Sequence, residues 1–188
     1  KAILAQHFNL SLVLPKGHLV PAIPARQQYL TWALSLLPPN AYQRSSTFLD
    51  VGAGPSAIYC LLAARITPES LSIIGTDVDP DAIAIGNINI RENSLSDRVQ
   101  LVVRQTDEAL IPDESFFGVP LALTVCNPPF YDVGSVPNNS VPPGTRLQME
   151  TKGGELEFLS CMVRQSRSRP NVWFTSLVGI KSDVPKIV

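Results

Sequence analysis

Residues 47–56 read TFLDVGAGPS, and this stretch is the strongest indicator of the fold. Its apolar beginning predicts a short strand, its glycines predict a tight turn, and AIYCLLAARI at 57–66 predicts a helix after the turn. Glycine lets the backbone turn sharply and approach a ligand closely, and the start of the following helix offers unpaired N–H groups. Ala57 stands where a dinucleotide fingerprint has its third glycine. The pattern therefore leaves open a dinucleotide, a nucleoside or a plain tight turn.

The same alternation of strand and helix continues along the rest of the chain. LSIIGTDVD at 71–79 is a second strand that ends in acidic residues, and LALTVC at 121–126 runs into a double proline. The remaining predicted strands are 99–105 and 171–178, and the remaining predicted helices are 80–95 and 154–166. Strands that alternate with helices imply an α/β fold, with a parallel sheet covered by helices on both faces. In such sheets, ligands bind beyond the carboxyl ends of the strands.

Residues 1–46 predict an N-terminal helical cap ahead of a core at 47–188. The cap is expected to hold a short helix at 2–8, a short strand at 9–14, and a second helix that begins near Pro24 and ends at Pro38–Pro39. Apolar residues at helical spacing mark that second helix: Tyr29, Leu30, Ala33, Leu34 and Leu37. Near the other end, residues 131–153 are rich in proline, glycine and serine and predict a long loop. The sequence stops where a last helix should begin, so we expect two closing strands of the sheet to lie beyond it.

Composition excludes several classes of protein. With 188 residues, 45% of them hydrophobic and 16% charged, the chain has enough apolar side chains for one folded domain and does not resemble a disordered protein. No apolar run approaches the length of a membrane span. Three cysteines and two histidines are spread too widely to form a disulfide framework or a metal site, so we expect no metal and a reducing compartment.

The net charge of −1 hides an uneven distribution. Residues 1–46 carry four cationic side chains and no carboxylate, whereas the acidic residues concentrate in 47–118. Cationic side chains recur near the end of the predicted helix 154–166, at Arg164, Arg167 and Arg169. These basic segments could attract a polyanion or be an ordinary solvated surface, and the sequence does not decide between the two.

An acidic side chain and a polar–proline motif follow two of the predicted strands. Asp77 ends the second strand, where a carboxylate can accept both hydroxyls of a ribose, while Asp79 and Asp81 are expected to start a helix and complement its dipole. Asn127-Pro128-Pro129-Phe130 directly follows the strand at 121–126.

The chemistry that suits this NPPF sequence is methyl transfer to an amine conjugated with a ring or a carbonyl group. Such a nitrogen is barely basic, and the Asn127 side-chain oxygen and the Pro128 carbonyl can accept its two hydrogens and hold it in position. Phe130 offers a face on which a flat base can stack. Pro129 is the second proline of the motif and is counted with the candidate catalytic residues.

LDVGAG, TDVD and NPPF, in this order and spacing, resemble class I S-adenosylmethionine-dependent methyltransferases that methylate amino groups. The chain is similar, more narrowly, to the catalytic domain of the methyltransferase-like protein 16 family. Four further segments carry this resemblance: LVPAIPARQQYLTW (19–32), IYCLL (58–62), GGELEF (153–158) and WFTSLVGIKS (173–182). That family methylates adenine N6 in structured RNA, and its bacterial relative acts on 23S ribosomal RNA.

The resemblance implies a Rossmann-like fold, S-adenosylmethionine as cofactor and roles for particular residues. Arg26 would reach the carboxylate of the cofactor's methionine part, Gly52 would lie against the cofactor, and Asp77 would hold its ribose. Thr106 would contact the cofactor, although Asp107 or Glu108 could instead meet its adenine. The residues from Asn127 to Phe130 would form the catalytic loop, and Asn127 would also touch the cofactor.

The implied partner is a structured RNA. U6 small nuclear RNA and a nuclear or cytoplasmic location are expected for a eukaryotic source, and ribosomal RNA in the cytoplasm for a bacterial one. A protein-glutamine amino-methyltransferase and a non-catalytic binding module remain as alternatives, because fold alone does not establish activity. The oligomeric state stays open.

Overall fold

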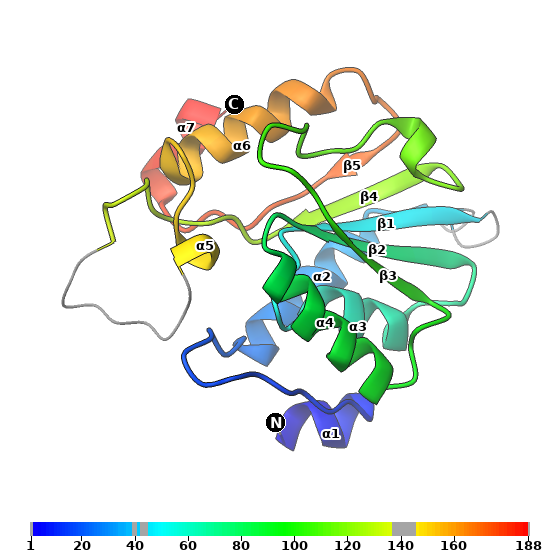
Figure 1. The fold of residues 1–188 in the computed structure, drawn as a ribbon. Coiled ribbons are helices and arrows are strands. Elements are labelled where there is room, and N and C mark those ends of the chain that lie inside the picture. The colour runs from blue at the N-terminus through cyan, green and yellow to red at the C-terminus, as the bar shows by residue number, and fades with distance from the viewer. Residues whose placement is uncertain (1, 39–40, 42–44, 137–145, 188) are drawn as a thin grey trace.

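The chain folds around a five-stranded sheet in the computed structural model, which describes residues 2–38, 41, 45–136 and 146–187. The strand order is β3-β2-β1-β4-β5, and every neighbouring pair is parallel (Figure 1). The strands are β1 (Ser46–Val51), β2 (Leu71–Asp77), β3 (Val99–Val103), β4 (Leu121–Cys126) and β5 (Trp173–Phe174). The predicted parallel α/β sheet is confirmed.

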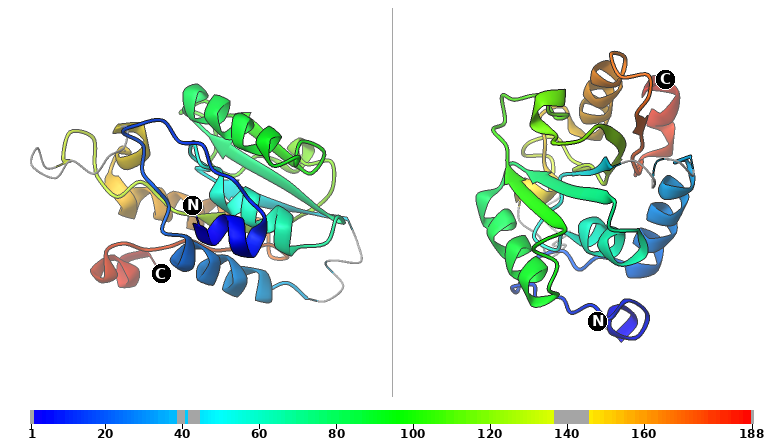
Figure 2. Two further views of the ribbon diagram at one scale, coloured as in Figure 1. Left: turned by 90° about the horizontal axis from the view of Figure 1, so that it is seen from below. Right: turned by 90° about the vertical axis from the view of Figure 1, so that its right-hand side faces the viewer.

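Helices cover both faces of this sheet. The helices are α1 (Ala2–Phe8), α2 (Ile23–Ser35), α3 (Ile58–Ile66), α4 (Pro80–Glu92), α5 (Arg146–Met149), α6 (Gly154–Ser166) and α7 (Val184–Ile187). Short 3₁₀ turns lie at Glu114–Phe116 and Lys181–Asp183. Figures 1 and 2 show α2, α3 and α4 on one side of the sheet and α6 on the other. None of the helices in the described ranges is long and apolar enough to cross a bilayer.

The side chains of β1 explain why this strand lies at the centre. All six of its residues are buried, and successive side chains point to opposite faces. Phe48 belongs to the hydrophobic cluster that α2, α3 and α4 form with the sheet, whereas Leu49 belongs to the cluster on the α6 side. Because residues of α1 and α2 join the first of these clusters, the N-terminal helices share a core with the sheet. The domain boundary at 46/47 stays a prediction.

The predicted strand at 9–14 is wrong. This segment begins an extended connection, residues 9–22, which we call the N-terminal strap and which runs from α1 to α2 (Figure 2, left). Its backbone pairs with two asparagine side chains of the α4 region instead of a strand. Asn89 accepts from Val13 N at 2.8 Å and donates to Val13 O at 3.0 Å, and Asn93 does the same for Ser11 at 2.8 and 2.9 Å. An alternating sequence pattern does not show whether the backbone will bond to a neighbouring strand or, as here, to asparagine side chains.

Two further predictions need correction near the C-terminal end. The strand predicted at 171–178 forms a regular ladder only at Trp173–Phe174, although Thr175 N and Leu177 N still donate to Thr124 O and Cys126 O of β4. The loop predicted at 131–153 contains the short helix α5 and an isolated bridge between Tyr131 and Glu150. Residues 137–145 of that loop lie outside the described residues.

Candidate functional site

A cavity of about 380 Å³ opens at the carboxyl ends of the strands, where ligands of parallel sheets bind. Its wall comes from the end of the N-terminal strap, the turns after β1 and β2, the loop after β3 and the loop after β4. The cavity brings together seven residues that the sequence and the family resemblance singled out: Arg26, Gly52, Asp77, Thr106, Asn127, Pro129 and Phe130. Pro128 is buried and does not line the cavity.

The turn after β1 forms one wall of this cavity. Gly52 and Gly54 have φ values of +75° and +62°, in the left-handed region that favours glycine. The N–H groups of Gly52 and Ala53 both donate to Thr76 O at 2.9 Å, which fixes the turn to the end of β2. Ala57, at the third-glycine position, also has a positive φ of 45°. A methyl group added at Gly52 would meet no atom within 4 Å, so this side of the turn is open for a ligand.

Asp77 ends β2 and lies directly across this turn. One carboxylate oxygen accepts from Gly54 N at 2.8 Å and the other accepts from Asp79 N at 3.0 Å. Burial raises the pKa of Asp77, and the two backbone N–H groups counteract that rise. Asp79 caps α4, because its side chain accepts from Asp81 N at 2.9 Å. The helix-start interpretation of Asp79 is therefore confirmed.

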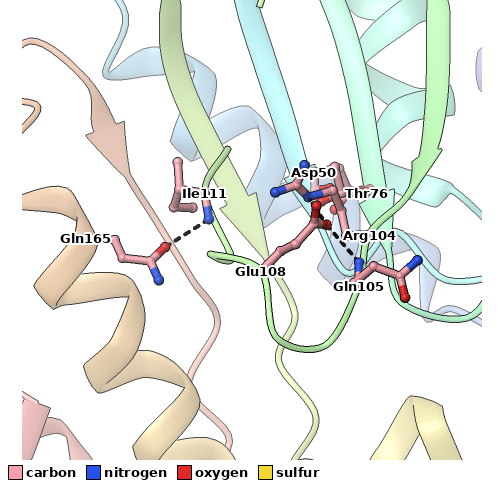
Figure 3. Close-up of polar contacts among 7 residues, drawn as sticks. All are labelled: Asp50, Thr76, Arg104, Gln105, Glu108, Ile111 and Gln165. Atoms are coloured by element: carbon pink, nitrogen blue, oxygen red, sulfur yellow. Dashed lines mark hydrogen bonds and ion pairs between the residues drawn. The ribbon is translucent and has the colours of Figure 1, made fainter. Parts of the chain in front are cut away.

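The loop after β3 is fixed at both of its ends (Figure 3). At one end, the Glu108 carboxylate accepts from Gln105 N at 2.8 Å and pairs with Arg104 Nε at 3.2 Å. At the other end, Ile111 N donates to the Gln165 side chain of α6 at 2.9 Å. Between these contacts, Thr106 and Glu108 line the cavity, whereas Asp107 does not. Asp107 and Glu108 were the alternatives to Thr106 for contacting the adenine of the cofactor, and of these two only Glu108 lines the cavity. Its carboxylate is already bonded to Gln105 N and Arg104 Nε.

Asn127 and Arg26 are hydrogen-bonded to each other in the wall of the cavity. The Arg26 guanidinium nitrogen Nη1 donates to the Asn127 side-chain oxygen at 2.9 Å and to the Tyr59 hydroxyl at 3.0 Å. The guanidinium carbon also lies 5.8 Å from the centre of the Tyr59 ring, within the range of a cation–π contact. The structure thus brings a residue of α2 to the loop after β4, 101 positions further along the chain.

Tyr29 ties α2 to the end of β4 and was predicted only as an apolar helix residue. Its buried hydroxyl accepts from Cys126 N at 3.2 Å and lies 2.8 Å from Thr175 Oγ1, which in turn donates to Thr124 O at 2.8 Å. Burial raises the pKa of Tyr29 far above its usual range, so the phenol stays neutral. The residue that precedes the Asn127 loop is therefore held by a hydroxyl from the N-terminal region.

Asp50 is a second residue whose surroundings the sequence does not reveal. Its carboxyl group is completely buried at the end of β1 (Figure 3), and the Cys60 thiol donates to Oδ2 at 3.6 Å. Within the described residues, Oδ1 has no hydrogen-bond partner. Burial raises the pKa of Asp50 to about 7. The sequence shows that Asp50 lies near the end of a strand, but it does not show that the carboxyl group is buried with one oxygen unpaired among the described residues.

Glu155 and Glu157 start α6 and differ sharply in their surroundings. Glu157 is exposed and pairs with Arg164 at 2.7 Å. Glu155 is 2% exposed, and its two carboxylate oxygens accept from Gly179 N at 2.6 Å and Ile180 N at 3.0 Å. The sequence predicted only a helix-start role for both acids, and for Glu155 the structure adds a long-range contact.

The three arginines near the end of α6 are not equivalent. Arg169 is largely buried, donates to Pro112 O and lies 3.9 Å from a Glu114 oxygen. Arg164 is exposed and paired with Glu157, and Arg167 is exposed. Arg169 therefore has a packing role, and only the other two face solvent. The described part of the chain contains no group of three or more metal-ligating side chains.

Proteins with similar sequences include RNA methyltransferases from eukaryotes and bacteria. A family model described as "RNA methyltransferase" matches residues 1–141. The U6 small nuclear RNA (adenine-(43)-N(6))-methyltransferase of Schizosaccharomyces pombe is 31% identical over all of this chain and 51% of its own length. The ribosomal RNA large subunit methyltransferase F of Aeromonas salmonicida is 31% identical over 98% of this chain and 65% of its own length. The chain thus spans about half the length of the first of these relatives.

A solved structure with the same fold is the hMettl16 catalytic domain in complex with MAT2A 3′UTR hairpin 1. It is 26% identical, with a TM-score of 0.80, over 98% of this chain and 66% of that one. This likeness confirms the predicted Rossmann-like fold of class I methyltransferases.

Proposed function

The chain belongs to the family of RNA methyltransferases, and on this basis we propose that it transfers a methyl group from S-adenosylmethionine to N6 of an adenine in structured RNA. The observation that carries the proposal is the meeting of Arg26, Asp77 and the Asn127–Phe130 loop in one cavity at the carboxyl ends of the strands. A nucleoside donor and a flat base need polar groups of this kind in a common pocket.

The residues of the cavity fit S-adenosylmethionine. The donor set contains a guanidinium for a carboxylate, a strand-end carboxylate for a ribose and an open glycine turn between them, at Arg26, Asp77 and Gly52. Thr106 would contact the adenosine part from the loop after β3, and Asn127 would adjoin the methionine part. When bound, the cofactor supplies an electrophilic methyl group on a sulfonium centre.

The catalytic work of this chain is positioning. The Asn127 side-chain oxygen would accept one N6 hydrogen of the target adenine, and Phe130 would stack on the ring. The Pro128 carbonyl, expected from the sequence to accept the other hydrogen, belongs to a residue that does not line the cavity and would have to turn toward it when the base binds. Holding the nitrogen in this way would aim its lone pair at the methyl carbon. As the N–C bond formed, the S–CH₃ bond would break and leave S-adenosylhomocysteine as a neutral thioether, and one N6 proton would pass to solvent. The target base must leave its stack to reach this pocket.

U6 small nuclear RNA is the proposed substrate. The fission yeast relative supports it by its name, at 31% identity over the whole of this chain. The ribosomal RNA enzyme from Aeromonas salmonicida is equally identical and makes ribosomal RNA the second candidate. A U6 substrate would place the protein in the nucleus.

The test is methyl transfer from labelled S-adenosylmethionine to a U6 transcript, followed by mass spectrometry of the nucleosides. We expect N6-methyladenosine from the wild type and a loss of about 100-fold or more with Asn127→Ala. Asn171→Ala, which changes an exposed asparagine, is the matched control. Full activity of Asn127→Ala would refute the mechanism. Label that entered protein and not RNA would instead favour a protein-glutamine methyltransferase, and failure to bind S-adenosylmethionine would favour a binding module.

A further inference from the structure

The ring of Phe130 rests against the backbone of Gly179, in the segment that follows β5. A methyl group at position 179 would lie 2.7 Å from Cδ1 and from Cε1 of Phe130, closer than real Cβ contacts allow. Phe130 also lines the cavity. The backbone at Gly179 therefore defines how far the ring can withdraw from a base in that cavity.

Glu155 holds this backbone segment in place. Its carboxylate is buried and accepts from two successive N–H groups, those of Gly179 at 2.6 Å and Ile180 at 3.0 Å. A methyl group on Gly179 would also lie 3.2 Å from Oε1, so the carboxylate and the Phe130 ring meet at the same residue. The position of Glu155 in the first turn of α6 stabilises its negative charge through the helix dipole.

The start of α6 also contacts the backbone of the residues that follow Phe130. Gly154 has a φ of +65°, and a methyl group there would approach Asp132 N at 3.3 Å and Tyr131 C at 3.7 Å. The Asp132 side chain accepts from Gly153 N at 2.8 Å, and Tyr131 N donates to Met149 O at 2.9 Å. The start of α6 and the end of α5 thus fix the main chain after Phe130 directly, and Glu155 fixes the backbone against which the ring packs.

We propose that Glu155 is a positioning residue for the methyl transfer, which sets the Phe130 ring against the target base by holding Gly179 behind it. Glu155 does not line the cavity, so it acts through Phe130 and not on the cofactor. The inference rests on the proposed function, because it gives the Phe130 ring a base to stack on.

Glu155→Gln in the whole protein tests this role. The amide keeps one acceptor oxygen but turns an NH₂ group toward one of the two N–H donors, which loosens the 179–180 segment. We expect kcat/KM for a U6 transcript to fall about 10-fold, with the affinity for S-adenosylmethionine in calorimetry changed less than twofold. Glu157→Gln, on the same helix turn but exposed, is the matched control and should retain the wild-type kcat/KM.

A double-mutant cycle with Phe130→Leu distinguishes an effect of Glu155 on the position of the Phe130 ring from a general disturbance of the structure. If Glu155 acts through the ring, adding Glu155→Gln to Phe130→Leu lowers kcat/KM by less than twofold further. A full 10-fold further loss, or an unchanged kcat/KM for Glu155→Gln alone, would overturn the inference.

Gly179→Ala provides a second approach if Glu155→Gln does not fold. It pushes mainly on the ring, at 2.7 Å, and leaves the chemistry of the carboxylate unchanged although the methyl group also lies 3.2 Å from Oε1. It should give the same loss and the same lack of additivity with Phe130→Leu. A folded Gly179→Ala variant with wild-type kcat/KM would also overturn the inference. A wild-type protein that does not methylate the U6 transcript would contradict the proposed substrate, which is a different outcome from an active wild type with a neutral Glu155→Gln.

Discussion

Arg26 and Asn127 are hydrogen-bonded to each other, with 2.9 Å between the guanidinium nitrogen and the side-chain oxygen. The first is proposed to hold the carboxylate of the methyl donor, and the second to hold the amine that receives the methyl group. The residue proposed to bind the donor and the residue proposed to bind the acceptor therefore contact each other directly in the structure. The Tyr59 hydroxyl accepts a further hydrogen bond from the same guanidinium.

Arg26→Lys should weaken cofactor binding. A lysine ammonium keeps the charge but lacks the planar fork that pairs with a carboxylate while also contacting Tyr59 and Asn127. We expect the Kd for S-adenosylmethionine to rise about 10-fold, or about 1.4 kcal/mol, in calorimetry. Arg164→Lys, at an exposed position, should leave it unchanged. An unaltered Kd for Arg26→Lys would remove Arg26 from the cofactor site.

The cofactor should bind before the target base is captured. A carboxylate is a stronger acceptor for a guanidinium than an amide oxygen, so its arrival frees Asn127 Oδ1 for the N6 hydrogens. With 2-aminopurine placed next to the target adenine of a U6 transcript, where its fluorescence rises when that adenine leaves the stack, we expect the fluorescence change to require S-adenosylhomocysteine. Methylthioadenosine, which lacks the carboxylate, is the control ligand and should not support that change. Equal signals with and without either ligand would exclude this order.

Asp50→Asn should alter how stability depends on pH. Burial raises the pKa of Asp50 to about 7, so the folded protein keeps a proton that the unfolded chain releases near pH 4. The Asp50 contribution to the free energy of unfolding is therefore complete below pH 4, falls by roughly 1.4 kcal/mol per pH unit toward pH 7 and is level above it.

The asparagine variant should lose this slope and be more stable than the wild type at pH 8. Urea unfolding between pH 4 and 8 measures the effect, and Asp97→Asn, at an exposed position, should follow the wild-type curve. A slope that survives in Asp50→Asn would assign it to another group.

Gly75→Ala should destabilise the centre of the sheet. A methyl group there would lie 2.6 Å from Leu101 Cδ2 and 2.8 Å from Cys60 Sγ, between β2, β3 and α3. Overpacking of this kind costs about 1–3 kcal/mol, which urea unfolding would detect. Gly118→Ala is the control, because a methyl group at that position meets nothing within 4 Å. Gly75→Ala with wild-type stability would show that Leu101 and Cys60 repack without cost.

The parallel sheet and the strand-end residues of the cavity wall were predictable because local patterns specify them. Strand, glycine turn and helix follow one another within a few residues around Gly52, and a polar residue at each strand end predicts Asp77 and Asn127. The sequence gives less information where a partner is distant. Glu155 and Glu157 look alike as helix-start acids, and only packing against Gly179 and Ile180 separates them. Asn89 is an ordinary helix residue by pattern, yet its side chain replaces a strand for the N-terminal strap.

That replacement has a consequence for protein engineering. Asn89 and Asn93 hold the N-terminal strap through backbone atoms of Val13 and Ser11, and the buried side chains of Leu10 and Leu12 anchor it in the core. The exposed side chains of the strap take no part in either kind of contact. Further along the strap, residues 19–22 line the cavity. The exposed positions of the strap are thus a site where charge or a fluorescent label can be introduced beside the cavity, while the side-chain amides of Asn89 and Asn93 keep its main chain in place.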